Sequence, residues 1–306
     1  MNLIGNRLVL PLFDAELTKC DKYDLCDGIS LFTLPAHYKD RIRSHPDLIA
    51  RYEKSIDFMK SAIAIQPDAI GGLETTNWST LMELAVFVAM SIRLATGVPV
   101  DVPYWFDAEG DEIKGFGNTQ VKTYRTDHRY LYPLDDGLQA DGLNALQSGF
   151  NAVLEKHVND ANSNVLIRAI QFAAIAFQTR HIQSRLVNNT IYIETLFSGS
   201  NTEIAFQIAS SVSWYLEFQS SSDKRIALFT EIKELYGYRS KIVHGADVSA
   251  KGKNLRRALA FSEMLNTRIF QRILNNNHVE IFSLKQDRRD KELKLLSLGA
   301  DSALLA

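Results

Sequence analysis

The distribution of proline divides this sequence into two parts with different folding constraints. All seven prolines lie within the first 133 residues, and none follows Pro133. Proline breaks helices from within, because it lacks a backbone N–H and its ring clashes with the preceding turn. From about Leu143 glycine is also sparse until Gly245. The second half of the chain is therefore free to form long helices, whereas the first half favours mixed structure.

Apolar residues in the second half recur at helical spacing, in segments separated by short polar breaks. The expected helices cover about residues 163–177, 182–196, 203–215, 223–245 and 255–274. Candidate N-caps are Asn162 or Ser163 for the first helix, Asn201 or Thr202 for the third, and Ser222 or Asp223 for the fourth. Short connections between helices indicate a bundle of antiparallel neighbours.

The first half predicts strands around an acidic turn. Residues 2–13 and 98–106 are rich in strand-forming apolar residues, and Pro103 favours an edge position for the second strand. Residues 107–112 predict a hairpin turn, and residues 121–132 predict its return strand. The turn lacks the glycine and the final carboxylate of a calcium-binding loop, so we expect no metal there.

Two helices are also expected in this half. Residues 47–65 have helical spacing, and a second helix is expected to begin after Thr76 or Asn77 and to end near residue 95, before Gly97. We therefore predict a mainly α protein with two domains. Residues 1–160 would form a mixed α/β sensor or regulatory region, and residues 161–306 a helical bundle.

Composition excludes several classes of protein and of site. The net charge of −2 does not fit a polycation that coats nucleic acid, so RNA contacts must come from a local patch. Cys20 and Cys26 form no standard zinc spacing and are expected to be free thiols. Asp135, Asp136 and Asp141 predict a solvated loop rather than a metal cluster. We expect no cofactor and no metal.

The most apolar window, residues 81–95, is interrupted by Glu83 and Arg93. It is expected to be too short and too charged to span a bilayer. The N-terminus lacks the long apolar region of a signal peptide. These features predict a soluble, cytoplasmic protein without a membrane partner.

The end of the fourth expected helix carries an arginine and a histidine five residues apart, Arg239 and His244, directly before Gly245. At about 100° per residue, Arg239 falls on the apolar face and His244 about 140° further round. Because breaking a buried ion pair costs about 3–5 kcal/mol, Arg239 needs a wet cleft or a carboxylate partner such as Glu194 or Glu234.

This pair has the chemistry for cutting RNA without a metal. The carbonyl end of a helix favours a protonated imidazole, by about 0.3–1 kcal/mol at exposed sites. Such a histidine can act as general base and general acid, and an arginine can hold a phosphate. The spacing also arises by chance, and in that alternative Arg239 only pairs with a carboxylate and His244 only ends the helix.

The surrounding residues resemble the signature of HEPN domains, specifically their Apea-like branch. In that branch an arginine–serine pair near a helix end is followed by Val-His-Gly, as Arg239-Ser240 is followed here by Val243-His244-Gly245. Residues 191–197 are similar to the branch's Leu-Glu-x-Leu helix, with Glu194 in the glutamate position. The resemblance covers about residues 162–275.

The resemblance implies an endoribonuclease that works as a homodimer, with two Arg-x4-His segments in one cleft and no metal. Arg239 would contact the scissile phosphate, His244 would act on the 2′-hydroxyl or the leaving oxygen, and Ser240 would position either. The products would carry 2′,3′-cyclic phosphate ends. Supporting residues would be Glu194, Tyr236 and Tyr238, with Tyr236 also expected in the core.

The family resemblance also implies a role in antiviral defence, abortive infection or a toxin–antitoxin stress response, with a trigger or neutralising protein as a further partner. HEPN toxins that are controlled by adenylylation carry a tyrosine two residues after the histidine. Here that residue is Ala246, so this mode of control is not expected.

Local charge agrees with an RNA partner, since six basic residues and one acid lie between residues 239 and 257. The basic residues are Arg239, Lys241, Lys251, Lys253, Arg256 and Arg257. They could supply phosphate contacts, or they could simply solvate the start of a helix.

Two other functions remain open. One is a non-catalytic HEPN module that binds RNA, a nucleotide or a protein partner through Arg239. The other is a helical scaffold or regulatory subunit whose N-terminal region binds a protein.

Overall fold

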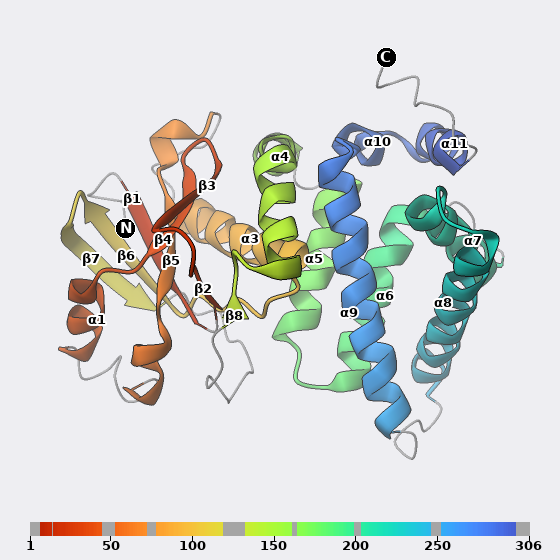
Figure 1. The fold of residues 1–306 in the computed structure, drawn as a ribbon, viewed down its shortest axis with the longest axis horizontal. Helices are drawn as coiled ribbons and strands as arrows, with labels where there is room; N and C mark the ends of the chain where they lie inside the picture. The colour runs from red at the N-terminus through yellow and green to blue at the C-terminus, as the bar shows by residue number, and fades with distance from the viewer. Residues whose placement is uncertain are drawn as a thin grey trace. The chain divides into compact units, whose positions relative to one another are not determined.

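In the computed structural model the chain is mainly helical, with a mixed N-terminal part and a C-terminal helical bundle, as the sequence predicts (Figure 1). The structure describes residues 7–13, 15–44, 53–71, 78–118, 132–160, 164–198, 203–245 and 252–297. The chain divides into two compact units, Met1–Asn159 (unit 1) and Asp160–Ala306 (unit 2). The expected domain boundary lies one residue further along the chain.

Unit 1 contains a six-stranded antiparallel sheet with the strand order β3-β4-β5-β1-β6-β7. The strands are β1 (Arg7–Leu12), β3 (Lys22–Cys26), β4 (Ile29–Thr33), β5 (Ser61–Ile65), β6 (Tyr104–Glu109) and β7 (Glu112–Asn118). Two short strands, β2 (Ala15–Glu16) and β8 (Tyr132–Pro133), pair in parallel. The helical segments of this unit are α1 (Ala36–Arg43), η1 (Glu53–Phe58), η2 (Pro67–Ala69), α3 (Trp78–Thr96) and α4 (Gly137–Asp160).

The central strand β1 tolerates Pro11 because of its register. β6 pairs only with Arg7–Val9 of β1, so the ladder on that side has ended before Pro11. Phe13, two residues on, donates to the carbonyl of Asp101 instead. The missing N–H of Pro11 therefore costs no hydrogen bond between the two strands.

Two strand predictions in unit 1 need correction. β6 begins after Pro103 and lies between β1 and β7, so the expected edge position is wrong. The acidic hairpin turn is confirmed, with Gly110 at φ 59°. The return strand, however, starts directly at Glu112 rather than at residue 121, and residues 121–131 of the expected strand lie outside the described residues.

The helix expected over residues 47–65 is also wrong where the structure describes it. Residues 53–58 form the 3-10 turn η1, and residues 61–65 form β5, which is buried at every position. β5 lies between β4 and β1, so both of its edges are paired, and the burial of every residue shows that both of its faces are covered. A short apolar run of this kind has no alternating pattern that distinguishes a strand from a helix.

The helix expected to end near residue 95 is confirmed as α3, and Gly97 adopts a left-handed φ of 71° after it. Its candidate caps Thr76 and Asn77 lie outside the described residues. Among the described residues, α3 is long and apolar enough to cross a membrane, with a mean hydropathy of 1.4, but 67% of that window is buried. The expectation that it is too short is therefore wrong, and its burial is that of a core helix.

The long helix α4 was not predicted. Its apolar residues Leu143, Leu146, Phe150 and Val153 are buried, but three glycines and several polar residues interrupt the pattern. Gly142 allows α4 to approach α3, since a Cβ there would lie 2.2 Å from the carbonyl oxygen of Ala95.

Asp135 is a further correction, because it is buried rather than solvated. Its carboxylate accepts hydrogen bonds from the backbone N–H groups of Thr18 (2.8 Å) and Lys19 (2.6 Å) and from the Thr18 hydroxyl (2.8 Å). Asp136 beside it is exposed and pairs with Lys19 at 2.7 Å. Asp135 thus fastens the segment after β8 to the segment after β2.

Unit 2 is the predicted helical bundle. Its helices are α5 (Val165–Gln178), α6 (Ile182–Phe197), α7 (Ile204–Glu217), α8 (Ser222–Val243), α9 (Gly252–Asn275), α10 (Val279–Ser283) and α11 (Gln286–Ser297). The five expected helices are confirmed as α5 to α9, whereas α10 and α11 were not predicted. In space α5 packs on α6, α7 packs on α8, and α6 also packs on α9 (Figure 1).

The observed caps differ from the expected ones by a residue or two. Asn164 caps α5 by accepting from the N–H groups of Leu166 and Ile167, and Ser221 caps α8 by accepting from Lys224 N–H. Residues 161–163 and 199–202, which include the other candidate caps, lie outside the described residues. One-residue shifts at helix ends leave the register of each apolar face unchanged.

Candidate functional site

The end of α8 is set by the sequence that follows Val243. His244 is the C-cap, and its N–H donates to the carbonyl of Ser240 at 3.0 Å. Gly245 has a φ of 73° and its N–H donates to the carbonyl of Ile242 at 3.0 Å. A left-handed residue after the last helical turn satisfies free carbonyls, and glycine adopts it without strain. The backbone therefore fixes His244 at the carbonyl end of the helix.

Arg239 has the carboxylate partner that its position requires, namely Glu194 on α6. Its Nη2 donates a hydrogen bond of 3.2 Å to Oε2, and its Nε lies 3.0 Å from Oε1. The Nε contact has the distance of an ion pair but lacks hydrogen-bond alignment. The Arg239 side chain is 30% exposed and that of Glu194 is 19% exposed. The pair thus lies at the edge of the core, where Arg239 still reaches solvent.

The environment of Glu194 shifts its titration. Burial raises the pKa of this carboxyl, and the charge and hydrogen bond of Arg239 oppose that shift. Because burial outweighs the effect of Arg239 on this pKa, the carboxylate lies in a poorly solvated place. Its role in this geometry is to orient the guanidinium of Arg239.

Tyr236 belongs to the core. It is 5% exposed, its hydroxyl lies 3.5 Å from the carbonyl oxygen of Thr190 on α6, and burial raises the pKa of the phenol well above its usual value. The ring therefore supports the packing of α8 against α6 and is not available to stack on a base.

Ser240 and His244 are both exposed. On a helix they project about 100° and 140° away from the direction of Arg239. The structure therefore places Arg239 and His244 within two turns of each other on α8 but on different flanks.

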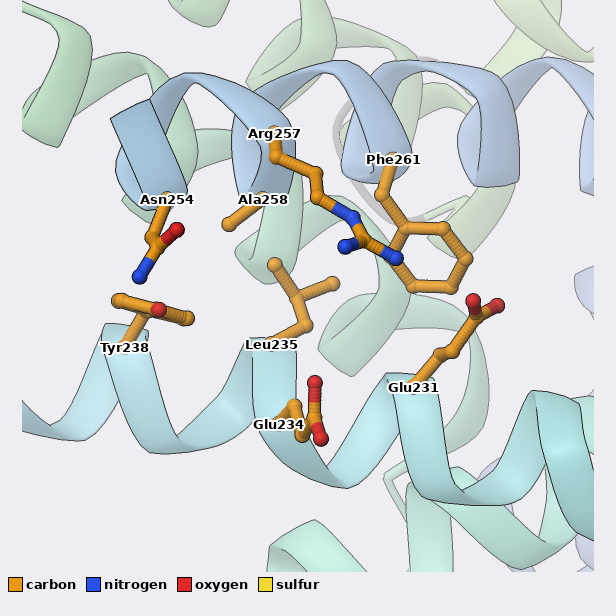
Figure 2. A pocket seen from close by; sticks show the side chains of 8 residues that line it. All are labelled: Glu231, Glu234, Leu235, Tyr238, Asn254, Arg257, Ala258 and Phe261. Atoms are coloured by element: carbon orange, nitrogen blue, oxygen red, sulfur yellow. The ribbon is translucent and has the colours of Figure 1, made fainter. Parts of the chain in front are cut away.

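A pocket of about 220 Å³ opens between α8 and α9 (Figure 2). Tyr238 lines one end of it, with Asn254 opposite. The Tyr238 ring also has Lys241 Nζ 6.0 Å from its centroid. Tyr238 is half-buried, so its ring is partly available to a ligand.

The structure brings one predicted basic residue, Arg257, into this pocket together with residues that the sequence analysis did not assign to a site. These are Glu231, Asn254 and Phe261, and also Glu234, which the sequence analysis names only as a candidate partner of Arg239. The signal was present, since 231, 234 and 238 are spaced as one face of a helix, as are 254, 257 and 261. Their neighbourhood depends on how two helices pack, which the spacing within each helix does not encode.

The remaining predicted basic residues are distributed on the surface. Lys241, Lys253 and Arg256 are exposed, and Lys251 lies outside the described residues. Because Glu231 and Glu234 lie across the pocket from Arg257, the region is not uniformly positive. The charge of this pocket therefore does not favour a phosphate.

Within the described part of the chain, no group of three or more His, Cys, Asp or Glu residues could hold a metal ion. Cys20 and Cys26 are free thiols, and burial raises the pKa of Cys26 to about 12. A thiol with this pKa is protonated near neutral pH and is a weak nucleophile.

Compared with models of protein families, with curated proteins and with solved structures, the chain gives no significant match. The resemblance to HEPN domains therefore rests on the residues around Arg239, His244 and Glu194.

Proposed function

We propose that the protein is a metal-independent endoribonuclease of the HEPN type that acts as a homodimer. The observation that carries this proposal is the placement of Arg239 and His244. Glu194 orients the arginine at the edge of the core, and the helix end presents the histidine to solvent. The arrangement supplies a fixed positive charge and a proton carrier on the same helix, which are the two groups that metal-free RNA cleavage requires.

In the proposed reaction, His244 accepts the proton of a ribose 2′-hydroxyl, and the 2′-oxygen attacks the adjacent phosphorus. The bond to the 5′-oxygen breaks, and that oxygen takes up a proton from water as it leaves. Arg239 stabilises the negative charge that develops on the non-bridging oxygens. Ser240 contributes a hydroxyl on the same exposed flank of α8 as His244, and this hydroxyl can orient the phosphate. The products are a 2′,3′-cyclic phosphate and a 5′-hydroxyl.

The different flanks of Arg239 and His244 support a composite site. Since helix geometry separates these side chains by about 140° around one α8, a second copy would supply the histidine that meets the arginine of the first at one phosphate. A two-fold axis near the C-terminal half of α8 would form two equivalent sites of this kind.

We further propose that the enzyme works in the cytoplasm in antiviral defence, abortive infection or a toxin–antitoxin response. In this proposal unit 1 senses a trigger or binds a neutralising protein. Both statements rest on the HEPN resemblance of unit 2.

The test is to incubate purified protein with mixed cellular RNA in EDTA and to determine the ends of the fragments. We expect cleavage that persists in EDTA and leaves cyclic phosphates. His244→Ala should abolish it without unfolding the protein, because the side chain is exposed. His181→Ala is the matched control. His181 is also an exposed histidine, but it lies at a helix N-terminus, as the N-cap of α6, rather than at a helix C-terminus. Undiminished cleavage by His244→Ala would contradict the mechanism.

A second candidate function is RNA binding without cleavage. It is favoured by the ion pair itself, because Glu194 already occupies two nitrogens of Arg239. In that case RNA would stay intact with the wild-type protein as well as with both histidine variants. Arg239→Ala would weaken a salt-sensitive binding of RNA.

A further inference from the structure

The pocket between α8 and α9 has walls of opposite hydrogen-bonding character. The α8 wall provides Glu231 and Glu234, whose carboxylates only accept hydrogen bonds. The α9 wall provides Arg257, which can donate up to five hydrogen bonds, and Asn254, which can both donate and accept them. Figure 2 shows Arg257 extending from α9 along the pocket, with the glutamates projecting from α8. A complementary ligand therefore presents donors on one edge and acceptors on another.

These charged groups are free to bind a ligand. Glu231, Glu234 and Arg257 are exposed, and within the described ranges none of their side chains forms an ion pair or hydrogen bond with another residue. Two carboxylates also repel a phosphate, so the group that enters is not the anionic part of a nucleic acid.

The remaining walls favour a flat ring. Tyr238 and Phe261 are half-buried aromatic residues at different ends of the pocket, and the buried Leu235 and Ala258 form its apolar base. The volume of about 220 Å³ is below the range of about 300–1,000 Å³ for sites of drug-sized ligands. The pocket therefore suits one base rather than a larger ligand, and single-stranded RNA is read by stacking and by base-edge hydrogen bonds.

Guanine is the base whose edges match both walls. Its N1–H and exocyclic amino group donate side by side, as a carboxylate requires, and its O6 and N7 accept side by side, as a guanidinium requires. Cytosine lacks the paired donors, and adenine and uracil lack both paired edges. The pocket also adjoins the proposed cleavage site in the sequence, because Tyr238 directly precedes Arg239.

We propose that this pocket binds one guanine base of the RNA substrate and directs cleavage to phosphates near it. The inference rests on the proposed ribonuclease function and adds a base preference to it. Glu231 and Glu234 accept from the Watson–Crick edge, Arg257 donates to O6 and N7, and Tyr238 or Phe261 stacks on the ring.

The test measures binding, so that it does not depend on cleavage. Short RNAs that differ only in one central base, guanine, adenine, cytosine or uracil, are titrated against His244→Ala and followed by fluorescence anisotropy. We expect the guanine RNA to bind at least about fivefold more tightly than the others, the discrimination of one good bidentate contact. The double variant Glu231→Gln, Glu234→Gln should remove that preference, as should Arg257→Leu.

The control is Glu203→Gln, which neutralises an exposed glutamate before α7 and outside the pocket. It should keep the preference for guanine. Equal binding of all four RNAs, or a guanine preference that survives both pocket variants, would overturn the proposal. Sequencing the ends of cleaved RNA separates the two hypotheses. Cleavage without base preference would contradict the guanine pocket alone, whereas guanine-selective binding without any cleavage would contradict the ribonuclease alone.

Discussion

Arg239 on α8 and Glu194 on α6 face each other, with Nε 3.0 Å from Oε1 and Nη2 3.2 Å from Oε2. The contact joins residues 45 positions apart in the sequence and fixes a cation one residue after Tyr238 and five before His244. An arginine that is oriented in this way loses less conformational entropy when it binds a phosphate than a freely moving side chain does.

Replacing the carboxylate should therefore impair cleavage more than stability. We expect Glu194→Gln to lower the rate of RNA cleavage about tenfold to hundredfold, the effect of misplacing a group at a reacting centre. The free energy of unfolding should fall by only about 1 kcal/mol, because the ion pair is partly exposed. Single-turnover cleavage and urea unfolding measure the two effects.

The matched control is Glu263→Gln on α9. Glu263 pairs with Arg185 on α6, and their side chains are 31% and 28% exposed, which is similar to the exposure of Glu194 and Arg239. Its removal should change stability by a similar amount and leave cleavage intact. Equal losses of activity in the two variants would show that the Arg239 pair acts only through general stability.

Two glycines in long helices should respond in opposite ways to alanine. Gly142 in α4 touches α3 so closely that a Cβ would lie 2.2 Å from Ala95 O, whereas a Cβ at Gly237 in α8 meets nothing within 4 Å. Gly142→Ala should destabilise unit 1 by about 1–3 kcal/mol through overpacking. Gly237→Ala should raise the free energy of unfolding of unit 2 by up to about 1 kcal/mol, since alanine favours helices.

Hydrogen exchange of α4 and of α8 reports on each substitution separately. Unchanged protection of α4 in Gly142→Ala would contradict the close approach of the two helices. A loss of stability in Gly237→Ala would indicate that another surface packs against this exposed face of α8.

The pH dependence of unit 1 should be governed by His157 on α4. Its ring stacks on Phe87 at 3.9 Å, its Nδ1 is buried without a described partner, and burial lowers the pKa of the imidazole to about 4. In the unfolded chain the group titrates near 6.5. Between these values the unfolded state binds more protons than the folded state.

The contribution of neutral His157 to the free energy of unfolding is therefore fully present above pH 6.5. It falls as the pH decreases toward 4, by on the order of 3 kcal/mol over the whole interval. His157→Phe keeps a ring on Phe87 and removes the proton-binding site. In that variant the exchange protection of α4 should change little between pH 6.5 and pH 4. The same steep fall in both proteins would contradict the assignment to His157.

The sequence was sufficient where the chemistry is local to one helix. It predicted α8, its glycine stop, the burial of Tyr236 and the need of Arg239 for a carboxylate, with Glu194 as one of two candidates. These features depend on periodicity, capping and the cost of an unpaired charge. The choice of Glu194 over Glu234 depended on which face of α8 meets α6, and Glu234 lies on the flank toward α9.

The errors share a physical cause. A strand that is covered on both faces, such as β5, has no alternation that distinguishes it from a helix, and in α4 one of the interrupting glycines, Gly142, serves a contact with α3. Asp135 was assigned to a solvated loop, but hydrogen bonds to residues more than 100 positions away bury it. The pocket of Glu231, Glu234 and Arg257 likewise exists only once α8 and α9 are neighbours.

The most direct test of the central claim is to mix two inactive variants, Arg239→Ala and His244→Ala, after unfolding and refolding them together. In a composite site each mixed dimer retains one intact arginine–histidine pair, so cleavage should return to about a quarter of the wild-type rate for random pairing of two-fold dimers. Each variant refolded alone should stay inactive. If mixed dimers form, as native mass spectrometry would show, and cleavage does not return, then Arg239 and His244 do not act on one phosphate across two copies.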